Sequence, residues 1–341
     1  MILEASVALT SLAALRWLAH QAILRGLRAP RLHHARQPDE AGAGPRPGPV
    51  RAQHIRGPRG RRLFSWLVAP ARPCAEPAPA VLVMHGWGAN AALMWPVVQP
   101  LHEAGFAVLL LDARCHGLSD DEAYTSMPRF AEDIAAGLHW LRAQPGIAPD
   151  RVALLGHSVG AAAALLHAAR WADVRAVVSL SAFAHPAEVM RRWLVEKRLP
   201  YPVLGWYLLR HVQGVIGARF DDIAPLHTLA RVRCPVLLVH GREDRTVPFS
   251  DAERLQAQAA HTELLPVTGD HDLREHLAPH AAALVAFLHR AFAGPGALAP
   301  GLGAPPAGAD TETAATAANS SPPVPVLVPV PAPSLGAAAA G

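Results

Sequence analysis

The chain has 341 residues, of which 51% are apolar and 17% are charged. This length permits one large α/β domain with extra segments at both ends, and this composition excludes a chain that is disordered throughout. The three cysteines, Cys74, Cys115 and Cys234, lie far apart in the sequence, which excludes a disulfide framework and a four-thiolate zinc site. We therefore expect reduced thiols in a folded protein that faces the cytosol.

The positive charge is concentrated at the N-terminal end. The net charge of the whole chain is +4, yet residues 1–75 alone hold twelve arginines against Glu4, Asp39 and Glu40. Such a basic arm can attract nucleic acid or an anionic membrane surface. No stacking aromatic residues alternate with these arginines and no nucleic-acid-binding module is visible, so we predict no nucleic-acid partner.

Residues 1–35 are apolar and basic. Their longest uncharged run, Ala5–Leu15, is shorter than the approximately 20 residues that span a bilayer, and no basic region and cleavage site mark a secretory signal. Two interpretations stay open: a helix packed on the domain, or a membrane anchor that lets Arg16 reach the interface. Arginines after a spanning segment would keep the C-terminal part of the chain in the cytoplasm. The predicted location is therefore the cytoplasm or the cytoplasmic face of the inner membrane.

Composition divides the rest of the chain into three parts. Residues 36–49 form a Pro/Gly-rich linker, and residues 294–341 are an Ala/Pro/Gly-rich tail that we predict to be disordered, because neither stretch can bury enough apolar surface. Residues 50–293 between them are the predicted folded domain.

Within this domain, short apolar runs alternate with helical patterns. The runs are AVLVM at 80–84, FAVLLL at 106–111, RVALL at 151–155, VRAVVSL at 174–180, PVLLV at 235–239 and TELLPV at 262–267, with helical patterns at approximately 91–103, 127–144, 160–170, 249–260 and 275–292. Unbroken apolar runs of this length are typical of strands buried on both faces. The alternation predicts an α/β fold, a mostly parallel sheet wrapped by helices, whose ligands bind at the carboxyl ends of the strands.

The residues after the RVALL run have the pattern of a nucleophile elbow. Gly156-His157-Ser158-Val159-Gly160 stands between a predicted strand and an Ala-rich predicted helix. A turn this sharp admits only small residues beside the serine and holds its hydroxyl out at the edge of the sheet. Ser158 is therefore the predicted nucleophile.

A serine hydroxyl needs a general base, and the base needs a carboxylate to orient it. Asp244 follows the PVLLV run and His271 follows the TELLPV run, in the order Ser, acid, His that this kind of fold uses. We predict that Asp244 and His271 complete a catalytic triad. Three neighbouring carboxylates could take the role of Asp244 instead: Glu243, Asp270 and Asp272. Alternatively, they are solvated loop charges or helix caps.

The oxyanion of an acyl-transfer intermediate needs backbone donors. The first predicted donor is the N–H of Val159, which follows the nucleophile. The second is the N–H of Trp87 in the His85-Gly86-Trp87-Gly88 loop, where glycines let the backbone approach the substrate. The alternative is that these glycines only make a turn and that Trp87 covers the core.

Other polar residues after strands are interpreted as structural. Asp112, Arg114 and His116 are expected to stabilise their own loop rather than to catalyse. His85, His116 and His240 form no close pair at the helical spacing of metal ligands. We predict neither a metal nor an organic cofactor.

Residues 183–232 interrupt the alternation and are predicted to form a small helical cap over the nucleophile. Some of its apolar side chains could line an acyl pocket, while half or more would pack on the core and the remainder could face a membrane. The candidates are Trp193, Tyr201, Leu204, Trp206, Tyr207 and Leu208.

Over residues 50–293 the sequence resembles the α/β-hydrolase superfamily, in particular a bacterial esterase/lysophospholipase-like branch with a short cap. The motifs are HGWG, D-x-R-x-H-G, GHSxG, HGxxDxxVP and a late GxH. The resemblance implies an eight-stranded sheet, the triad Ser158, Asp244 and His271, and the oxyanion positions Trp87 and Val159. Similar bacterial proteins often begin with an apolar anchor. Two positions depart from the pattern: Cys115 replaces a glycine, and Asp270 replaces a small residue before the histidine.

The predicted activity is that of a serine hydrolase of the carboxylesterase or thioesterase type. Its expected substrate is a small-molecule ester or thioester with a modest apolar acyl group, cleaved through an acyl-enzyme. A peptidase-like hydrolase and a catalytically idle scaffold protein with this fold are the alternatives. An aspartate-nucleophile dehalogenase is excluded by the serine at position 158.

Overall fold

The structure is a computed structural model that describes residues 11, 14, 16–18, 20–35, 49–71, 76–198, 201–273 and 276–294. Apart from residues 49 and 294, the predicted linker at 36–49 and the predicted disordered tail at 294–341 lie outside the described residues, as does Cys74.

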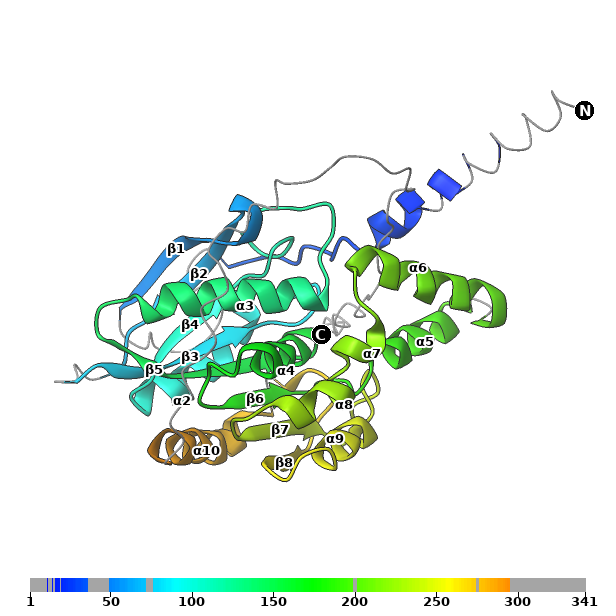
Figure 1. The fold of residues 1–341 in the computed structure, drawn as a ribbon. Coiled ribbons are helices and arrows are strands. Elements are labelled where there is room, and N and C mark those ends of the chain that lie inside the picture. The colour runs from blue at the N-terminus through cyan, green and yellow to red at the C-terminus, as the bar shows by residue number, and fades with distance from the viewer. Residues whose placement is uncertain are drawn as a thin grey trace, which may run out of the picture.

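The centre of the molecule is an eight-stranded sheet with the order β1-β2-β4-β3-β5-β6-β7-β8 (Figure 1). The strands are β1 Val50–Arg56, β2 Arg62–Val68, β3 Ala78–Met84, β4 Ala107–Leu111, β5 Ile147–His157, β6 Val177–Leu180, β7 Val236–Gly241 and β8 Thr262–Val267. β1 and β2 pair antiparallel with each other, β2 pairs antiparallel with β4, and the remaining pairs are parallel. The predicted α/β fold with a mostly parallel eight-stranded sheet is confirmed.

Side chains of the central strands alternate between two buried clusters, one on each face of the sheet. Leu82 of β3 packs in the cluster that contains α3 and α4, whereas Val83 packs in the cluster that contains α2 and α10. The helices are η3 Ala91–Val97, α2 Val98–Glu103, α3 Met127–Arg142, α4 Val159–Trp171, α9 Phe249–Gln256, η7 Ala278–His280 and α10 Ala281–Ala293, with the short turn η2 at Pro58–Gly60. Burial on both faces explains the unbroken apolar runs.

Two predicted helices are divided. The helix expected at 91–103 is a 3₁₀ turn, η3, followed by α2, and Pro96 lies inside η3. The helix expected at 275–292 likewise begins with η7, which contains Pro279, before α10. Proline has no N–H to donate and disfavours the α conformation of the residue before it, so it favours such boundaries.

The chain between β6 and β7 is helical. It contains α5 Pro186–Glu196, η4 Tyr201–Gly205, α6 Trp206–Ile216, α7 Phe220–Ile223, α8 Pro225–Thr228 and η5 Leu229–Arg231. Figure 1 shows α5 and α6 lying together beside the sheet domain, with α7 and α8 leading back to it. We refer to residues 183–232 as the cap.

The described part of the N-terminal segment packs against the domain. Residues 20–26 are helical, and Ile23, Leu27 and Ala29 belong to the hydrophobic core on the α3 and α4 side. Farther along, the buried ring of His34 lies 3.1 Å from the carboxylate of Asp112. Among the described residues, no helix combines the length and the apolar character needed to cross a bilayer.

Candidate active site

Ser158 lies at the sharp turn between β5 and α4. Its backbone has φ 52° and ψ −117°, a conformation that residues with a side chain rarely adopt. Its N–H donates to the carbonyl of Leu180 on the neighbouring strand at 2.8 Å. A Cβ at Gly156 would lie 2.4 Å from the carbonyl oxygen of Gly160, and a Cβ at Gly160 would lie 2.3 Å from that of His85. Close backbone approach therefore requires glycine at both positions of the elbow.

The structure brings Ser158, His271 and Asp244 into one connected row. His271 Nε2 lies 3.0 Å from Ser158 Oγ, and His271 Nδ1 lies 2.8 Å from Asp244 Oδ2. Because a carboxylate only accepts hydrogen bonds, Nδ1 carries the proton of the neutral ring and Nε2 is free to accept one from the serine. All three side chains are buried, at 4%, 9% and 6% exposure for Ser158, His271 and Asp244.

Asp244 is held in an ionised state by its surroundings. Its Oδ1 accepts hydrogen bonds from the N–H groups of Thr246 and Val247. Burial by itself raises the pKa of this carboxyl, but hydrogen bonds from His240 and His271 outweigh burial and hold the pKa below its ordinary value. An ionised Asp244 can orient His271 and stabilise its cationic form.

Two of the rival carboxylates interact with backbone instead. Glu243 accepts a hydrogen bond from the N–H of Gly269, and Asp270 accepts one from the N–H of Asp272. Both contacts shape the loop that carries His271. The residue before the histidine, Asp270, is exposed.

Sequence reasoning missed two histidines that support this row. His157 Nε2 donates to the carbonyl of His271 at 2.9 Å, and His240 Nε2 donates to the carbonyl of Val247 at 2.8 Å. Burial and the nearby His271 lower the pKa of His157 to about 4, so its ring is neutral near pH 7. His157 is inside the GHSxG motif, but the motif alone does not reveal its partner.

The predicted oxyanion loop lies against the nucleophile. A Cβ at Gly86 would lie 3.3 Å from the Cβ of Ser158, so the loop backbone touches the elbow. Trp87 is buried in the core cluster, and Val159 begins α4 directly after the serine. Unpaired N–H groups at the first turn of a helix favour a negative charge there.

Two neutral histidines join this loop to the loop after β4. His85 accepts the N–H of Ala113 at Nε2, and His116 accepts the N–H of Gly88 at Nε2, both at 3.0 Å. Burial lowers the pKa of His85 to about 3, with a further contribution from His116, and burial lowers the pKa of His116 to about 4. Both rings therefore hold the loop after β3 as neutral hydrogen-bond acceptors.

The other polar residues of the loop after β4 form the expected stabilising network. Asp112 accepts the N–H groups of Ala91 and Leu118, and the fully buried Arg114 pairs with Asp133. Cys115 stands in this loop with φ 64°, a left-handed conformation that suits the glycine it replaces.

The chain is similar to known proteins in sequence and in fold. A sequence family described as serine aminopeptidase, S33 (Hydrolase_4), matches residues 75–213. The uncharacterized protein Rv2307c of Mycobacterium tuberculosis (strain H37Rv) is 31% identical over 216 residues, which cover 62% of this chain and 69% of that protein. The chain belongs to the α/β-hydrolase superfamily.

Two further similarities agree with membership of the α/β-hydrolase superfamily. The uncharacterized protein YfhR of Escherichia coli (strain K12) is 26% identical over 236 residues, covering 68% of this chain and 76% of that protein. The solved esterase Pf2001 of Pyrococcus furiosus superimposes with a TM-score of 0.59 and 19% identity, covering 77% of this chain and 98% of the esterase. At this identity the superposition supports the fold alone.

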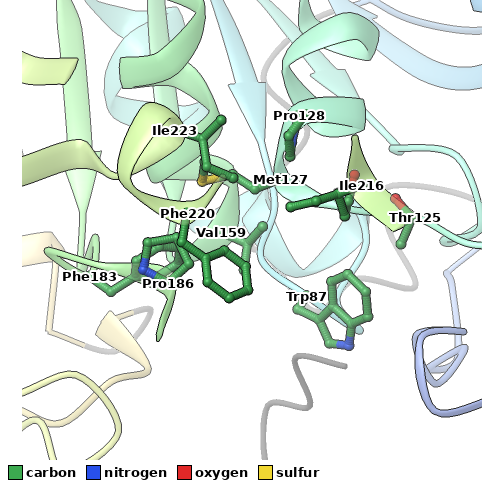
Figure 2. Close-up of a pocket in the computed structure, with 11 residues that line it drawn as sticks. Trp87, Thr125, Met127, Pro128, Val159, Phe183, Pro186, Ile216, Phe220 and Ile223 are labelled. Atoms are coloured by element: carbon green, nitrogen blue, oxygen red, sulfur yellow. The ribbon is translucent and has the colours of Figure 1, made fainter. Parts of the chain in front are cut away.

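Next to the elbow, this α/β-hydrolase has a small apolar pocket between the sheet domain and the cap. Figure 2 shows the side chains around it. Those from the sheet domain are Trp87, Thr125, Ser126, Met127, Pro128 and Val159, and those from the cap are Phe183, Pro186, Ile216, Phe220 and Ile223. Trp87 and Val159, the two predicted oxyanion positions, are thus both part of the pocket lining.

The cap residues that line this pocket differ from the six candidates that the sequence offered. None of the six expected residues is among them. Trp193 and Tyr201 pack partly buried against the core and Leu208 is buried, whereas Leu204, Trp206 and Tyr207 are exposed. Half of the six therefore pack on the core, as expected. Other cap residues line the pocket, because sequence alone does not say which side of a cap helix faces the sheet.

Among the described residues, one group of three side chains has the composition of a metal site. The ligand atoms of His185, Asp221 and His227, at the two ends of the cap, lie within 4.8 Å of one another. However, His185 Nδ1 accepts the N–H of Ala187, so Nε2 of the neutral ring carries a proton, which it donates to Asp221 at 3.0 Å. A metal ion at Nε2 would displace that proton to Nδ1, and His185 could then no longer accept the N–H of Ala187 at the start of α5. The present contacts therefore favour a hydrogen-bonded group.

Proposed function

We propose that this α/β-hydrolase is a serine hydrolase that cleaves a carboxylic ester or thioester with a modest apolar acyl group. The observation that carries the proposal is the row Asp244–His271–Ser158, with separations of 2.8 Å and 3.0 Å and a tautomer that leaves Nε2 ready to accept a proton. This is the arrangement that activates a serine hydroxyl.

The proposed reaction has two halves. Ser158 Oγ attacks the carbonyl carbon while His271 Nε2 takes the hydroxyl proton, and Asp244 stabilises the resulting imidazolium. The tetrahedral intermediate collapses as His271 gives this proton to the leaving alcohol or thiol, which leaves the acyl group on Ser158. Water then attacks the acyl-enzyme, His271 takes its proton, and collapse of the second intermediate returns the proton to Ser158 and releases the acid.

The N–H groups of Val159 and Trp87 are the proposed oxyanion donors. A donor of this kind contributes about 3 kcal/mol to the transition state when it is fixed before the reaction begins. His116 supports this role because it holds the N–H of Gly88, next to Trp87, at 3.0 Å. Since nucleophile, base and donors all belong to the chain, the proposed reaction needs no cofactor.

The pocket favours an ester over a peptide as substrate. An aminopeptidase has to bind the ammonium group of its substrate, and acidic side chains or oriented carbonyls usually do so. The described residues that line the pocket are apolar apart from the two hydroxyl side chains of Thr125 and Ser126. A modest acyl chain fits such a lining, while the family description keeps a peptidase as the second candidate.

The proposed location is the cytoplasm or the cytoplasmic face of the inner membrane, with residues 1–35 contacting the membrane. Exposure of Trp17 and Leu18, at 60% and 57%, supports this contact. Both side chains belong to the part of the N-terminal segment that precedes the packed residues 20–35.

A fluorophosphonate probe tests the activity directly, since it reacts with activated serines. We expect the wild-type protein to be labelled and Ser158→Ala not to be. The length preference follows from p-nitrophenyl esters and acyl thioesters of graded length, with aminoacyl p-nitroanilides as the peptidase substrates. A folded wild-type protein that stays unlabelled and turns over none of these substrates would support the scaffold alternative and refute the proposal.

A further inference from the structure

Large apolar side chains are exposed mainly on one part of the molecule. Among the described residues, seven such side chains are at least 40% exposed, and six of them belong to the N-terminal segment or to the α5, η4 and α6 part of the cap. These six are Trp17, Leu18, Val195, Leu204, Trp206 and Tyr207, which we call the apolar face. The seventh, Leu118, is in the loop after β4. Scattered exposed residues need no explanation, but a concentration of them marks an interaction surface.

The two segments of the apolar face are in contact with each other. The ring of His20 meets that of His211 edge to face at 6.4 Å, and Tyr207 stacks on His211 at 5.0 Å. Figure 1 shows the described N-terminal helical residues beside α6. The N-terminal segment and the cap therefore present their exposed side chains from one continuous structure.

Helix α6 is apolar on more than its buried side. Leu208, Leu209, Val212 and Val215 form the stripe that packs inward. Trp206 and Tyr207 lie outside that stripe with exposures of 59% and 40%, and Arg210 one turn later is also exposed. The outer side chains are therefore not needed to attach α6 to the sheet domain.

The segments that carry the apolar face also carry positive charge. The exposed cations are Arg16, Arg25, Arg28, Arg191, Lys197, Arg198 and Arg210. The sequence has no acidic residue from 11 to 35, and only Glu196 from 189 to 217. Tryptophan and tyrosine beside arginine and lysine are the side chains that favour the head-group region of a bilayer, and the cations add attraction to anionic lipids. This charge complementarity identifies an anionic lipid surface as the occupant.

The pocket lies beneath the same helix. Ile216, the last residue of α6, lines the pocket next to Ser158, while the first residues of α6 belong to the apolar face. We propose that the apolar face docks on an anionic phospholipid bilayer and presents the pocket to acyl esters carried by that bilayer. The docking itself is independent of catalysis, and only the substrate depends on the proposed function.

A fluorescent probe on the cap tests the docking without relying on the N-terminal segment alone. The full chain carries Cys74→Ser with either Tyr207→Cys or Leu118→Cys, each labelled with the environment-sensitive dye NBD, because the cysteines at 115 and 234 are buried. With vesicles of phosphatidylcholine and phosphatidylglycerol, we expect a blue shift and a several-fold rise in emission at position 207 but not at 118. A label at 207 that stays in water while the protein sediments with vesicles would overturn the proposal.

Two comparisons complete the test. Trp206→Ser should weaken binding to the anionic vesicles about tenfold, since it removes a large apolar side chain from the contact, while Leu118→Ser should not change it. Equal binding to pure phosphatidylcholine vesicles contradicts the assignment of an anionic surface. If the NBD emission at position 207 changes with protein concentration in the absence of vesicles, the apolar face binds a second copy of the chain instead.

Failure of docking and failure of catalysis can be distinguished. Ser158→Ala should bind vesicles as the wild type does, and Trp206→Ser should hydrolyse a soluble short-chain p-nitrophenyl ester at the wild-type rate. If the fluorophosphonate probe labels the wild type but the label at 207 never leaves water, only the docking is wrong. If vesicles bind and no labelling occurs, only the proposed activity is wrong.

Discussion

The loops at the carboxyl edge of the sheet are polar and buried, whereas the outer side of the cap is apolar and exposed. At the sheet edge, Asp244, His271 and His157 all have hydrogen-bond partners at 2.7–3.0 Å. On the cap, Trp206 is 59% exposed and Val195 is 71% exposed. The first region fixes atoms for chemistry because burial makes every unpaired polar group costly, and the second is available for contact with another surface.

The largest expected effect tests whether Asp244 is the carboxylate that orients His271 at the sheet edge. Asp244→Asn should lower kcat by about 10⁴-fold with little change in stability, because an amide no longer selects the His271 tautomer with a free Nε2. Steady-state kinetics on the best p-nitrophenyl ester measure the loss. The matched control is Glu243→Gln, which keeps an acceptor for the N–H of Gly269 and should change kcat less than about threefold.

If Glu243→Gln is instead the damaging variant, the acid has been misassigned. Asp270→Asn provides the same comparison on the other side of His271. Circular dichroism of each variant separates a lost catalytic group from a lost fold.

The buried histidines give the stability of the sheet edge a pH dependence. The pKa of His116 is lowered to about 4, so the folded state stays neutral while the unfolded chain binds a proton below about pH 6.5. Its contribution to stability is thus fully present above pH 6.5 and falls by about 1.4 kcal/mol per pH unit between 6.5 and about 4. Urea unfolding at several pH values should show a shallower slope for His116→Gln than for the wild type.

Identical slopes for the wild type and His116→Gln would mean that this histidine is not held neutral.

The sheet was predictable because of how its strands are buried. β3 to β7 appeared as apolar runs since these strands face helices on both sides. β8 also appeared as an apolar run, although it is an edge strand and is mostly half-buried. β1 and β2 were not predicted individually. β1 lies at the edge of the sheet and is mostly exposed, with the sequence VRAQHIR, so it has no apolar run to detect.

The site was predictable only where local geometry restricts the residue type. The glycines of the elbow and the position of Ser158 follow from a backbone turn that other residues cannot make. The hydrogen bond from His157 to the carbonyl of His271 joins positions 114 residues apart, and no local pattern encodes it. Likewise, the cap sequence shows that its helices are apolar but not which residues reach the pocket, because that depends on how the helices dock.

Two glycines sharpen the contrast between the elbow and the cap. A Cβ at Gly160 would collide with the backbone oxygens of His85 and Met84, so Gly160→Ala should destabilise the protein by about 3 kcal/mol. Gly214 on α6 has open space around the same position, so Gly214→Ala should stabilise by up to about 1 kcal/mol. Urea unfolding of both variants measures the two opposite signs. A neutral Gly160→Ala would show that the elbow backbone can move away from the oxyanion loop.

The smallest expected effect concerns the loop after β4, where Cys115 has a positive φ. Its φ of 64° strains any residue that has a Cβ, at a cost of about 1 kcal/mol. Cys115→Gly should therefore be more stable than Cys115→Ala, although it removes more atoms from a buried site. At Cys234, which is also buried but lacks a positive φ, the order should reverse because glycine gains more freedom on unfolding. Thermal unfolding of the four variants measures both orders of stability. The same order at both cysteines would show that backbone strain at position 115 does not determine the stability of its variants.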